Sequence, residues 1–430
     1  MKRKPILLFA AFFIVVTLLV ACGADTGQED RHSESSLDTE NERVSINFFT
    51  VRDDLLITHY PAWFTAFDEL HPEIDVIAST SKNYEDDLQI MMAANDMPDV
   101  FEFTGIIYTN ALKSAYLMPL DDVFPDLVSQ WTNNSANINT DDDLTYALSY
   151  GLQGSGIVYN KLIFSELGLS PPKTLDELIT VGQIIKDSGN IGLIGCAKPG
   201  WTLLPYLHIA NVHMDDQVAY HEMMLENDDP FSIDCPFGIS MLVFKTLIDA
   251  GIMEDDLFAY DWEQYLRDFG SGKAGMVYTW TNTAVQFIDR GDGSLTFDDL
   301  GMVPFPYDNS GGPYKMNIGS DYGLAISKNT LNPDETITFF RWHMDDLYQE
   351  YINASSILSA REGVYSKVAF LEEIYTHSPF EVNELPLSDE YLNRMARAQW
   401  NRTSQYVEIA EGYQIQEILD RLNLAWSTAR

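Results

Sequence analysis

The region from residue 44 to residue 103 alternates strand-like and helix-like segments, and this alternation restricts the fold more than any other feature of the chain. Strand-like apolar patterns occur at residues 44–48, 74–77 and 99–103. Helix-like spacing of apolar residues fills the two intervals, starting at Pro61 and at Tyr84. Strand–helix–strand–helix–strand within about 60 residues predicts an α/β fold.

The same alternation returns further along the chain. Alternating residues from Leu144 to Tyr150 and the apolar run 157–159 predict two more strands. The glycines between these strands could let the chain bend between two bodies; they are Gly151, Gly154 and Gly156. A capping box formed by Thr174 and Glu177 then predicts the start of a helix.

Two late elements complete the pattern. Residues 322–327 are strand-like, and Asn332-Pro333 marks the start of a helix. Its apolar residues follow helical spacing at Ile337, Phe340, Met344, Leu347, Tyr348 and Tyr351. A chain of 430 residues is too long for one ordinary domain, so two domains are expected and three are possible.

The first 43 residues have the composition of a targeting segment followed by a tether. Lys2, Arg3 and Lys4 precede an apolar run from Ile6 to Val20, which is too short to span a membrane comfortably and typical of a signal peptide. The run ends in Leu19-Val20-Ala21-Cys22, which resembles the lipobox of bacterial lipoproteins.

These features predict a lipoprotein signal peptide over residues 1–21, lipidation of Cys22 and a flexible tether over residues 22–43. Two acyl chains on Cys22 would hold a globular body on the outer face of the cell membrane. The alternative is an uncleaved N-terminal anchor with a chance cysteine.

The charge balance excludes several classes of partner. The chain has 65 acidic and 26 basic residues, a net charge of −39. Such a surface repels phosphates, so the sequence argues against nucleic-acid binding and against a polybasic membrane-binding protein. Cys196 and Cys235 could form a disulfide outside the cell or remain buried thiols.

Sequence motifs of common enzymes and metal sites are missing. His221-Glu222 lacks the second histidine of a zinc protease, and Gly154-Ser155-Gly156 lacks the spacing of a serine-hydrolase elbow. Gly272-Lys273 lacks the rest of a phosphate loop, and the acidic segment 289–299 does not fit an EF-hand. We therefore expect no catalytic residue, no metal and no cofactor.

Several motifs in the body of the chain resemble one family. One stretch of the chain consists of Ile157–Lys161, then Leu167-Gly168-Leu169, and then residues 171–178 (PPKTLDEL). This stretch resembles the family 1 extracellular solute-binding proteins. These are the maltose-binding-protein-like receptors of ABC sugar importers. Weaker matches occur in the same order at residues 97–100, 272–276 and 322–327. Leu175 stands where the family usually has tryptophan, and roughly the last 65 residues match poorly.

The resemblance implies an α/β, two-lobed periplasmic-binding-protein-like fold with a hinged interlobe cleft. It implies an N-terminal lobe made of residues 44–153 and 321–362, and a C-terminal lobe made of residues 154–320 and 363–430. Closure of the hinge on a ligand would produce the shape that importer permease subunits recognise. A monomer is expected.

A sugar offers flat C–H faces to aromatic rings and a rim of hydroxyls to carboxylates and amides. The candidate ligand-binding residues are those expected where strands or glycine loops open into the cleft: Glu102, Tyr108, Tyr150, Trp201, Tyr278, Trp280, Asn282, Asp321, Tyr322 and Arg361. Arg361 could meet an acidic sugar or a carboxylate of the protein. Arg52 and Asp53 are further candidates, whereas Trp63 and Trp342 are expected to pack in the core.

The sequence thus predicts a lipid-anchored, non-catalytic receptor that captures a sugar, in particular an oligosaccharide, and delivers it to an ABC importer. A secreted glycan hydrolase with paired carboxylates is an alternative, and a ligand sensor with the same fold is another. Turnover of the ligand would favour the hydrolase, and binding without transport partners would favour the sensor.

Overall fold

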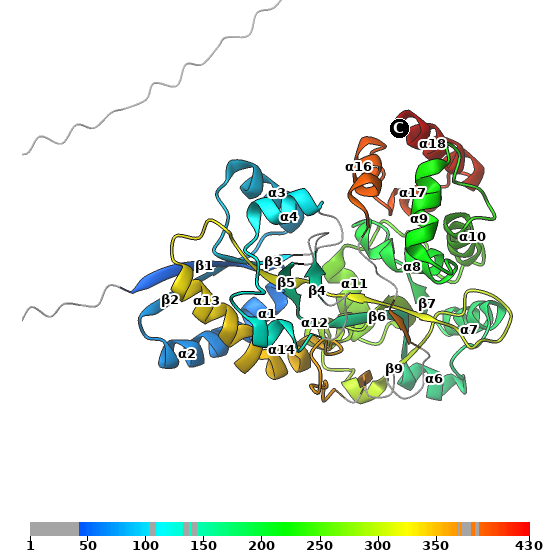
Figure 1. The fold of residues 1–430 in the computed structure, drawn as a ribbon. Helices are drawn as coiled ribbons and strands as arrows, with labels where there is room; N and C mark the ends of the chain where they lie inside the picture. The colour runs from blue at the N-terminus through cyan, green and yellow to red at the C-terminus, as the bar shows by residue number, and fades with distance from the viewer. Residues whose placement is uncertain are drawn as a thin grey trace, which may run out of the picture. The chain divides into compact units, whose positions relative to one another are not determined.

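The computed structural model describes residues 43–103, 109–131, 137–139, 144–368, 370–371, 380–382 and 387–430 (Figure 1). Two mixed β-sheets organise these residues. We call the first sheet with its helices the first lobe, and the second sheet with its helices the second lobe. The α/β, two-lobed arrangement expected from the sequence is confirmed.

The first sheet has six strands in the order β2-β1-β3-β11-β5-β4. The strands β1 and β2 and the strands β1 and β3 pair in parallel, whereas β11 runs antiparallel to both β3 and β5. The strand bounds are β1 Val44–Phe49, β2 Ile74–Ser79, β3 Val100–Phe103, β4 Asn137–Asn139, β5 Thr145–Ser149 and β11 Gly323–Ile326.

Helices pack on this sheet and close the core of the first lobe. Phe48 of β1 lies at the centre, with the rings of Tyr60 and Phe339 each 5.4 Å away. Trp63 and Trp342 are buried in the same core, which confirms their predicted packing role. The helices are α1 Asp53–Thr58, α2 Tyr60–Leu70, α3 Tyr84–Ala94, α4 Asn110–Tyr116, α5 Pro125–Val128, α13 Pro333–Arg341 and α14 Tyr348–Ser355.

The helix predicted to start at Asn332 is interrupted. A π-helical turn, Trp342–Asp346, separates α13 from α14. The wider turn places Trp342, His343 and Met344 in the core together, although three successive residues of a regular helix would point in different directions. Apolar spacing alone did not reveal this break.

The second sheet has the order β12-β10-β6-β8-β7, and β9 also pairs with β6. The long strand β6 is antiparallel to β8, β9 and β10, whereas β7 lies parallel to β8. The strand bounds are β6 Leu152–Asn160, β7 Ile191–Ile194, β8 Ala274–Trp280, β9 Leu300–Val303, β10 Met316–Ser320 and β12 Phe380–Val382.

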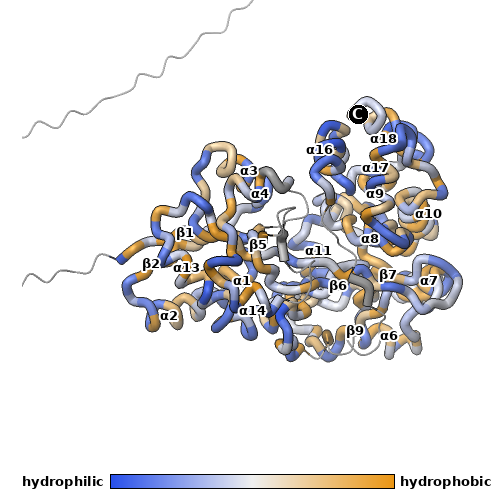
Figure 2. The backbone as a smooth tube through the Cα atoms, in the orientation of Figure 1, coloured by the Kyte–Doolittle hydropathy of each residue, from blue (hydrophilic) through white to orange (hydrophobic). Residues whose placement is uncertain are grey.

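The helices of the second lobe come from two separate parts of the chain. The C-terminal helices α16, α17 and α18 share a buried core with α8, α9 and α10. Hydrophobic and hydrophilic stretches alternate along the helices of both lobes (Figure 2), as expected where one helix face covers a sheet. The bounds are α6 Lys161–Leu167, α7 Leu175–Asp187, η1 Trp201–Leu203, α8 Leu204–Val212, α9 Gln217–Glu226, α10 Pro236–Asp249, α11 Trp262–Gly270, α12 Thr283–Arg290, η2 Phe297–Asp299, α16 Asp389–Arg397, α17 Ser404–Ala410 and α18 Ile415–Thr428.

The chain passes between the lobes where β5 leads into β6 and where β10 leads into β11. The two passages are hydrogen-bonded to each other, since Asp321 N donates to Gly151 O at 2.9 Å and Tyr150 N donates to Tyr322 O at 2.9 Å. A third passage follows α14, where Leu358 N donates to Leu152 O at 2.8 Å. These three paired segments are the only backbone connections from one sheet to the other in the described ranges.

The glycines near the first passage have a different role from the one predicted. Gly154 and Gly156 lie inside the continuous strand β6 and do not form a flexible break. A Cβ at Gly151 would lie 2.3 Å from Leu358 O, and one at Gly156 would lie 2.6 Å from Val303 O. The close approach of neighbouring backbone therefore requires glycine at both positions.

The two cysteines of the body are free thiols. Cys196 is buried and Cys235 is partly buried, so the disulfide alternative does not apply to this structure. Cys22, the predicted lipidation site, and the whole of residues 1–42 lie outside the described residues. Among the helices that the structure describes, we find none that combines the length and the apolar character needed to cross a membrane.

Candidate functional site

Three tryptophans from separate elements meet in the second lobe, and we call them the tryptophan cluster. Trp201 begins η1, Trp262 begins α11 and Trp280 ends β8. The ring centroids of Trp201 and Trp262 are 4.6 Å apart, and those of Trp201 and Trp280 are 6.2 Å apart with an interplanar angle of 26°. Trp201 is 46% exposed, so the cluster presents an indole surface to solvent.

The sheet and the start of a helix position these rings. Trp280 is held in register by the antiparallel pairing of β8 with β6, opposite Ser155. The start of α11 is fixed by Asp261, whose side chain accepts a hydrogen bond from Gln264 N at 2.9 Å. Each tryptophan therefore lies at the end of a well-defined element, where backbone flexibility is limited.

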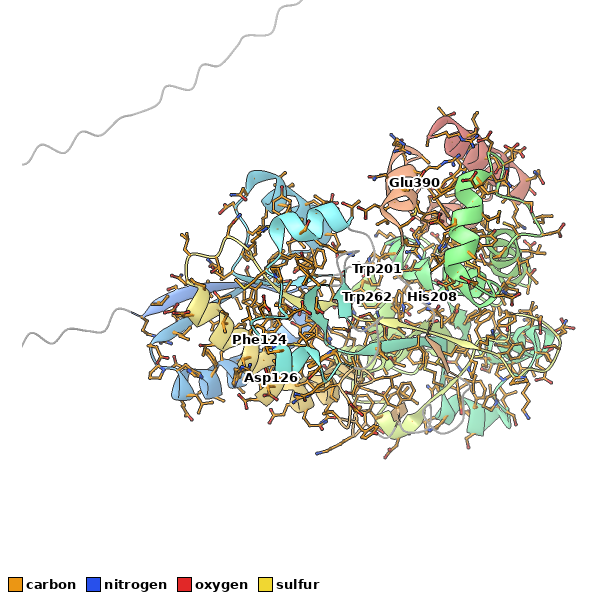
Figure 3. The ribbon with its side chains drawn as sticks, in the orientation of Figure 1. Phe124, Asp126, Trp201, His208, Trp262 and Glu390 are labelled. Carbon is orange, nitrogen blue, oxygen red and sulfur yellow. The ribbon has the colours of Figure 1, made fainter. Side chains whose placement is uncertain are left out.

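A buried histidine lies behind the cluster. The Nδ1 atom of His208 is 2.9 Å from Ser155 Oγ, and its ring lies 6.3 Å from that of Trp280. Burial lowers the pKa of His208 to about 3, so the imidazole is neutral at physiological pH. Figure 3 shows His208, Trp201 and Trp262 near one another on the second lobe. An exposed indole surface next to the uncharged imidazole of His208 suits a ligand with apolar faces.

A buried ion pair follows the first strand of the first lobe. Arg52 Nε donates to Asp54 Oδ1 at 2.9 Å, and Nη2 donates to Asp54 Oδ2 at 2.7 Å. Burial acts to raise the pKa of Asp54, but the adjacent guanidinium outweighs it and lowers that pKa. The Nη1 atom of Arg52 is buried and has no hydrogen-bond partner among the described residues, so one strong donor is left over.

Glu102 and Asp321 lie close to this pair and are almost fully buried. The carboxylate of Glu102 accepts hydrogen bonds from Thr50 Oγ1 at 2.8 Å and from Val51 N at 2.7 Å. Burial raises the pKa of Glu102 to about 7 and also raises the pKa of Asp321, although Arg52 opposes both shifts. Glu102 thus supports the end of β1, with both of its oxygens already bonded.

Electrostatics connect this part of the first lobe to the second lobe. Asp289 lies near the C-terminal end of α12, the helix that follows Trp280 in the sequence. Partial burial raises its pKa, and the charge of Asp54 adds to the shift, whereas His59 and Arg52 oppose it.

Two predicted ligand contacts lie in hydrophobic cores. Tyr150 is fully buried, and its ring centroid lies 4.2 Å from that of Tyr351 at an interplanar angle of 35°. Tyr278 is buried beside Phe305, at a centroid distance of 4.4 Å. We do not carry either residue forward as a ligand contact, because neighbouring side chains already surround both rings.

The polar groups of two other candidates are engaged within the first lobe. Tyr322 donates its hydroxyl hydrogen bond to Glu85 Oε1 at 2.9 Å. Arg361 Nε donates to Gln130 Oε1 and its Nη2 donates to Asp345 Oδ1, each at 2.7 Å. Arg361 was expected to meet either an acidic sugar or a carboxylate of the protein, and in the structure it is paired with the carboxylate of Asp345.

The remaining candidates are placed as follows. Asn282 is partly buried at the start of α12, directly after the tryptophan cluster, and makes no capping hydrogen bond. Asp53 is exposed at the start of α1. Tyr108 lies outside the described residues. No group of three or more possible metal ligands occurs in the ranges that the structure describes.

Sequence reasoning missed Trp262, Asp54 and His208. Trp262 follows a helix-capping aspartate, which predicts a helix start but not its position beside the end of β8. Asp54 was hidden among many acidic residues. Asp54 lies two residues after Arg52. This spacing indicates an ion pair only once β1 is known to end just before Arg52.

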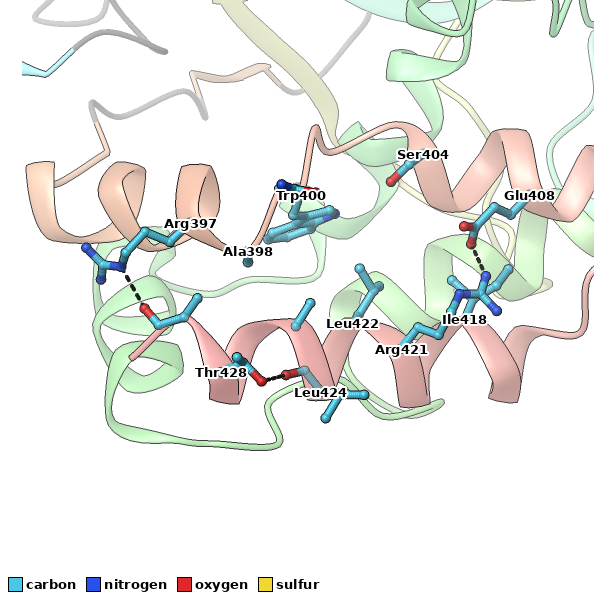
Figure 4. A pocket seen from close by; sticks show the side chains of 13 residues that line it. Arg397, Ala398, Trp400, Ser404, Glu408, Ile418, Arg421, Leu422, Leu424 and Thr428 are labelled. Atoms are coloured by element: carbon cyan, nitrogen blue, oxygen red, sulfur yellow. Dashed lines mark hydrogen bonds and ion pairs between the residues drawn. The ribbon is translucent and has the colours of Figure 1, made fainter.

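The structure also contains a groove of about 680 Å³ that is separate from the candidate site. It lies among α16, α17 and α18 (Figure 4), and none of the predicted ligand-binding residues contributes to it. Its lining includes Arg397, Trp400, Glu408, Arg421, Leu422 and Leu424. Since Arg421 is paired with Glu408, and Arg397 donates to Ala429 O, these groups already have partners in the protein.

The family comparison covers most of the body of the chain. The family described as "Bacterial extracellular solute-binding protein" matches residues 58–346. The multiple sugar-binding protein of Streptococcus mutans is 22% identical over 346 residues, which covers 79% of this chain and 78% of that protein. The melibiose/raffinose/stachyose-binding protein MelE of Bacillus subtilis is 27% identical over 195 residues, 44% of this chain and 41% of that protein.

Solved structures with the same fold include two sugar complexes. The mannobiose complex of an ABC-transporter binding protein from Bifidobacterium animalis subsp. lactis has a TM-score of 0.74 and 20% identity, covering 90% of this chain and 94% of that one. RafE in complex with raffinose has a TM-score of 0.73 and 18% identity, covering 90% and 99%. These likenesses confirm the two-lobed fold.

The family is one of binding proteins and not of enzymes, which removes the hydrolase alternative. From the extent of the family match, the chain belongs to the bacterial extracellular solute-binding proteins.

Proposed function

We propose that this protein captures an oligosaccharide outside the cell and delivers it to an ABC importer by closing its two lobes around the ligand. The tryptophan cluster is the observation that carries the proposal. It offers an exposed indole surface at the ends of β8, η1 and α11, which is the chemistry that the flat faces of sugar rings require. The names of its relatives, which include binding proteins for several oligosaccharides, support the same ligand class.

The first lobe would supply polar contacts. The unpaired Nη1 of Arg52 is a strong donor for a hydroxyl oxygen, and its position is fixed by the bidentate contact with Asp54. A ligand held between Arg52 of the first lobe and the tryptophan cluster of the second lobe would contact both lobes. A ligand with this double contact would favour the closed state.

The division of the chain into lobes is part of the proposal. We assign residues 44–153 and 321–362 to the N-terminal lobe, and residues 154–320 and 363–430 to the C-terminal lobe. The strand pairing supports this division, because β1 to β5 and β11 share one sheet while β6 to β10 and β12 share the other. The hinge would then lie at the paired segments around Gly151, Asp321 and Leu358.

We also propose that Cys22 carries a lipid anchor and that the protein is a monomer tethered to the outer face of the membrane. Cys22→Ala should release the protein into the soluble fraction without changing its affinity for sugar. A variant that stays in the membrane fraction would contradict the lipobox interpretation.

Calorimetric titration with a panel of oligosaccharides tests the binding function. The panel includes mannobiose, mannotriose, raffinose and stachyose. Trp280→Ala and Trp201→Ala should weaken binding of the best ligand by about 10- to 100-fold, since aromatic residues dominate such contacts. Tyr413→Ala is a matched control, because Tyr413 is also 46% exposed but lies in the loop between α17 and α18, outside the tryptophan cluster.

Two results would contradict the proposal. Equal affinity in the tryptophan variants and in the Tyr413→Ala control would remove the cluster from the site. Binding in the absence of any sugar uptake by cells that carry the full importer would favour a sensor.

A further inference from the structure

The turn that carries Trp201 is tied to a distant segment by one carboxylate. Glu254, in the loop between α10 and α11, accepts a hydrogen bond from Gly195 N at 2.8 Å through Oε2 and from Cys196 N at 2.7 Å through Oε1. Both donors lie directly after β7, on the path to Trp201. A carboxylate that accepts two backbone N–H groups fixes the local backbone strongly.

The backbone at this point has an unusual conformation. Cys196 has a φ of +55° and is completely buried. A residue with a Cβ is disfavoured in this left-handed region, so the surrounding contacts must maintain it. Thr202 contributes by donating a hydrogen bond from its hydroxyl to Cys196 O, which closes the turn immediately after Trp201.

Further contacts join the same two segments in parallel. Leu193 N donates to Ile252 O at 3.0 Å, and Ala197 N donates to Leu257 O at 2.7 Å. The segment after β7 leads to Trp201, and the segment from Ile252 to Asp261 leads to Trp262. The network around Glu254 therefore lies between the backbones that carry the two closest rings of the cluster.

We propose that Glu254 is a positioning residue for the tryptophan cluster. Its carboxylate holds the left-handed turn at Cys196, and this turn keeps the Trp201 ring against Trp262. The inference deepens the proposed function. Only its consequence for ligand affinity, namely that affinity depends on Glu254, rests on the proposed function. The geometric part concerns the ligand-free protein and stands apart from the identity of the ligand.

The test uses circular dichroism of the ligand-free protein and titration with the best oligosaccharide of the panel. Two indole rings in close contact give an exciton signal in the far ultraviolet, and Trp201→Phe defines the spectrum without it. Glu254→Ala removes both acceptors, whereas Glu254→Gln keeps one acceptor and places a donor against the other N–H. Asp255→Asn is the matched control, because its side chain is 95% exposed and it pairs only with Lys186 among the described residues.

We expect Glu254→Ala to lose most of the exciton signal, Glu254→Gln to lose part of it and Asp255→Asn to retain it. Affinity should fall on the order of tenfold in Glu254→Ala, because a binding site loosened by about 1 Å loses its preorganisation. Thr202→Val, which removes the second restraint on Cys196, should shift the signal in the same direction. This variant keeps the test decisive if Glu254→Ala folds poorly.

An exciton signal unchanged in both Glu254 variants and in Thr202→Val would overturn the positioning role. A lost signal with unchanged sugar affinity would support the positioning role, and it would show instead that the cluster is not the ligand site. The two proposals can therefore fail separately.

Discussion

Glu102→Gln should stabilise the protein at neutral and alkaline pH, because it replaces a buried carboxyl whose pKa is raised to about 7. The unfolded chain releases this proton near a pKa of about 4.5, so the native state binds more protons between these two values. Stability contributed by Glu102 is therefore highest below the lower pKa and is lost as pH rises through the native pKa. At about 1.4 kcal/mol for each unit, the loss reaches roughly 3 kcal/mol above pH 8.

The glutamine amide fits the contacts that surround Glu102. Its oxygen can accept from Val51 N, and its amide nitrogen can donate to Thr50 Oγ1, so the variant resembles the protonated acid. The difference in unfolding free energy between variant and native protein should grow by about 2 kcal/mol from pH 5.5 to pH 8.5. For a body of this size that corresponds to roughly 2–3 °C in Tm.

Urea denaturation and calorimetry of the two proteins across this pH range measure the effect. Glu69→Gln serves as the control, because Glu69 is exposed on α2 and its replacement removes the same charge. If the stability profiles of Glu102→Gln and the native protein run parallel with pH, the carboxyl does not keep a raised pKa and the reasoning is refuted. Sugar affinity should stay within about threefold of native, because both carboxylate oxygens serve β1 and not the ligand.

Three further substitutions test contacts within the two lobes and at the passage between them. Arg394→Ala should lower the unfolding free energy by about 3 kcal/mol, since Leu225 O loses its donor and Trp426 O keeps only the hydrogen bond from Ala429 N, and a loss below about 1 kcal/mol in urea denaturation would contradict this. Gly151→Ala should destabilise by about 2 kcal/mol because its Cβ would meet Leu358 O at 2.3 Å, and native stability on thermal unfolding would show that the passage can shift. Arg361→Ala should cost about 1–2 kcal/mol of stability and leave sugar affinity unchanged in titration; weaker binding would return Arg361 to the site.

The alternation of strand-like and helix-like segments predicted the first three strands of the first lobe well, because β1 and β2 are partly exposed and β3 is a short apolar run buried at every position. Residues 44–48, 74–77 and 99–103 correspond to β1, β2 and β3, each longer or shorter by one or two residues. Neither this pattern nor the resemblance predicted the order of the strands in the sheet, which the structure shows. The π-helical turn after α13 could not be predicted, because it changes the period of a helix without changing its composition.

The candidate site could be predicted only in part, because sequence shows which residues are aromatic but not which face of an element another layer covers. Trp201 and Trp280 lie together in the structure, whereas Tyr278, two residues before Trp280, is buried against Phe305. Trp262 joins them through its ring contact with Trp201 of η1, an element distant from α11 along the chain. The structure was needed to reveal such long-range contacts.

A crystal structure of the protein with the best-binding oligosaccharide tests the central claim most directly. We predict an intact sugar held between the lobes, with its ring faces on Trp201 or Trp280 and a hydroxyl near Arg52. A sugar bound only in the groove among α16, α17 and α18, or a ligand that has been cleaved, would contradict the account.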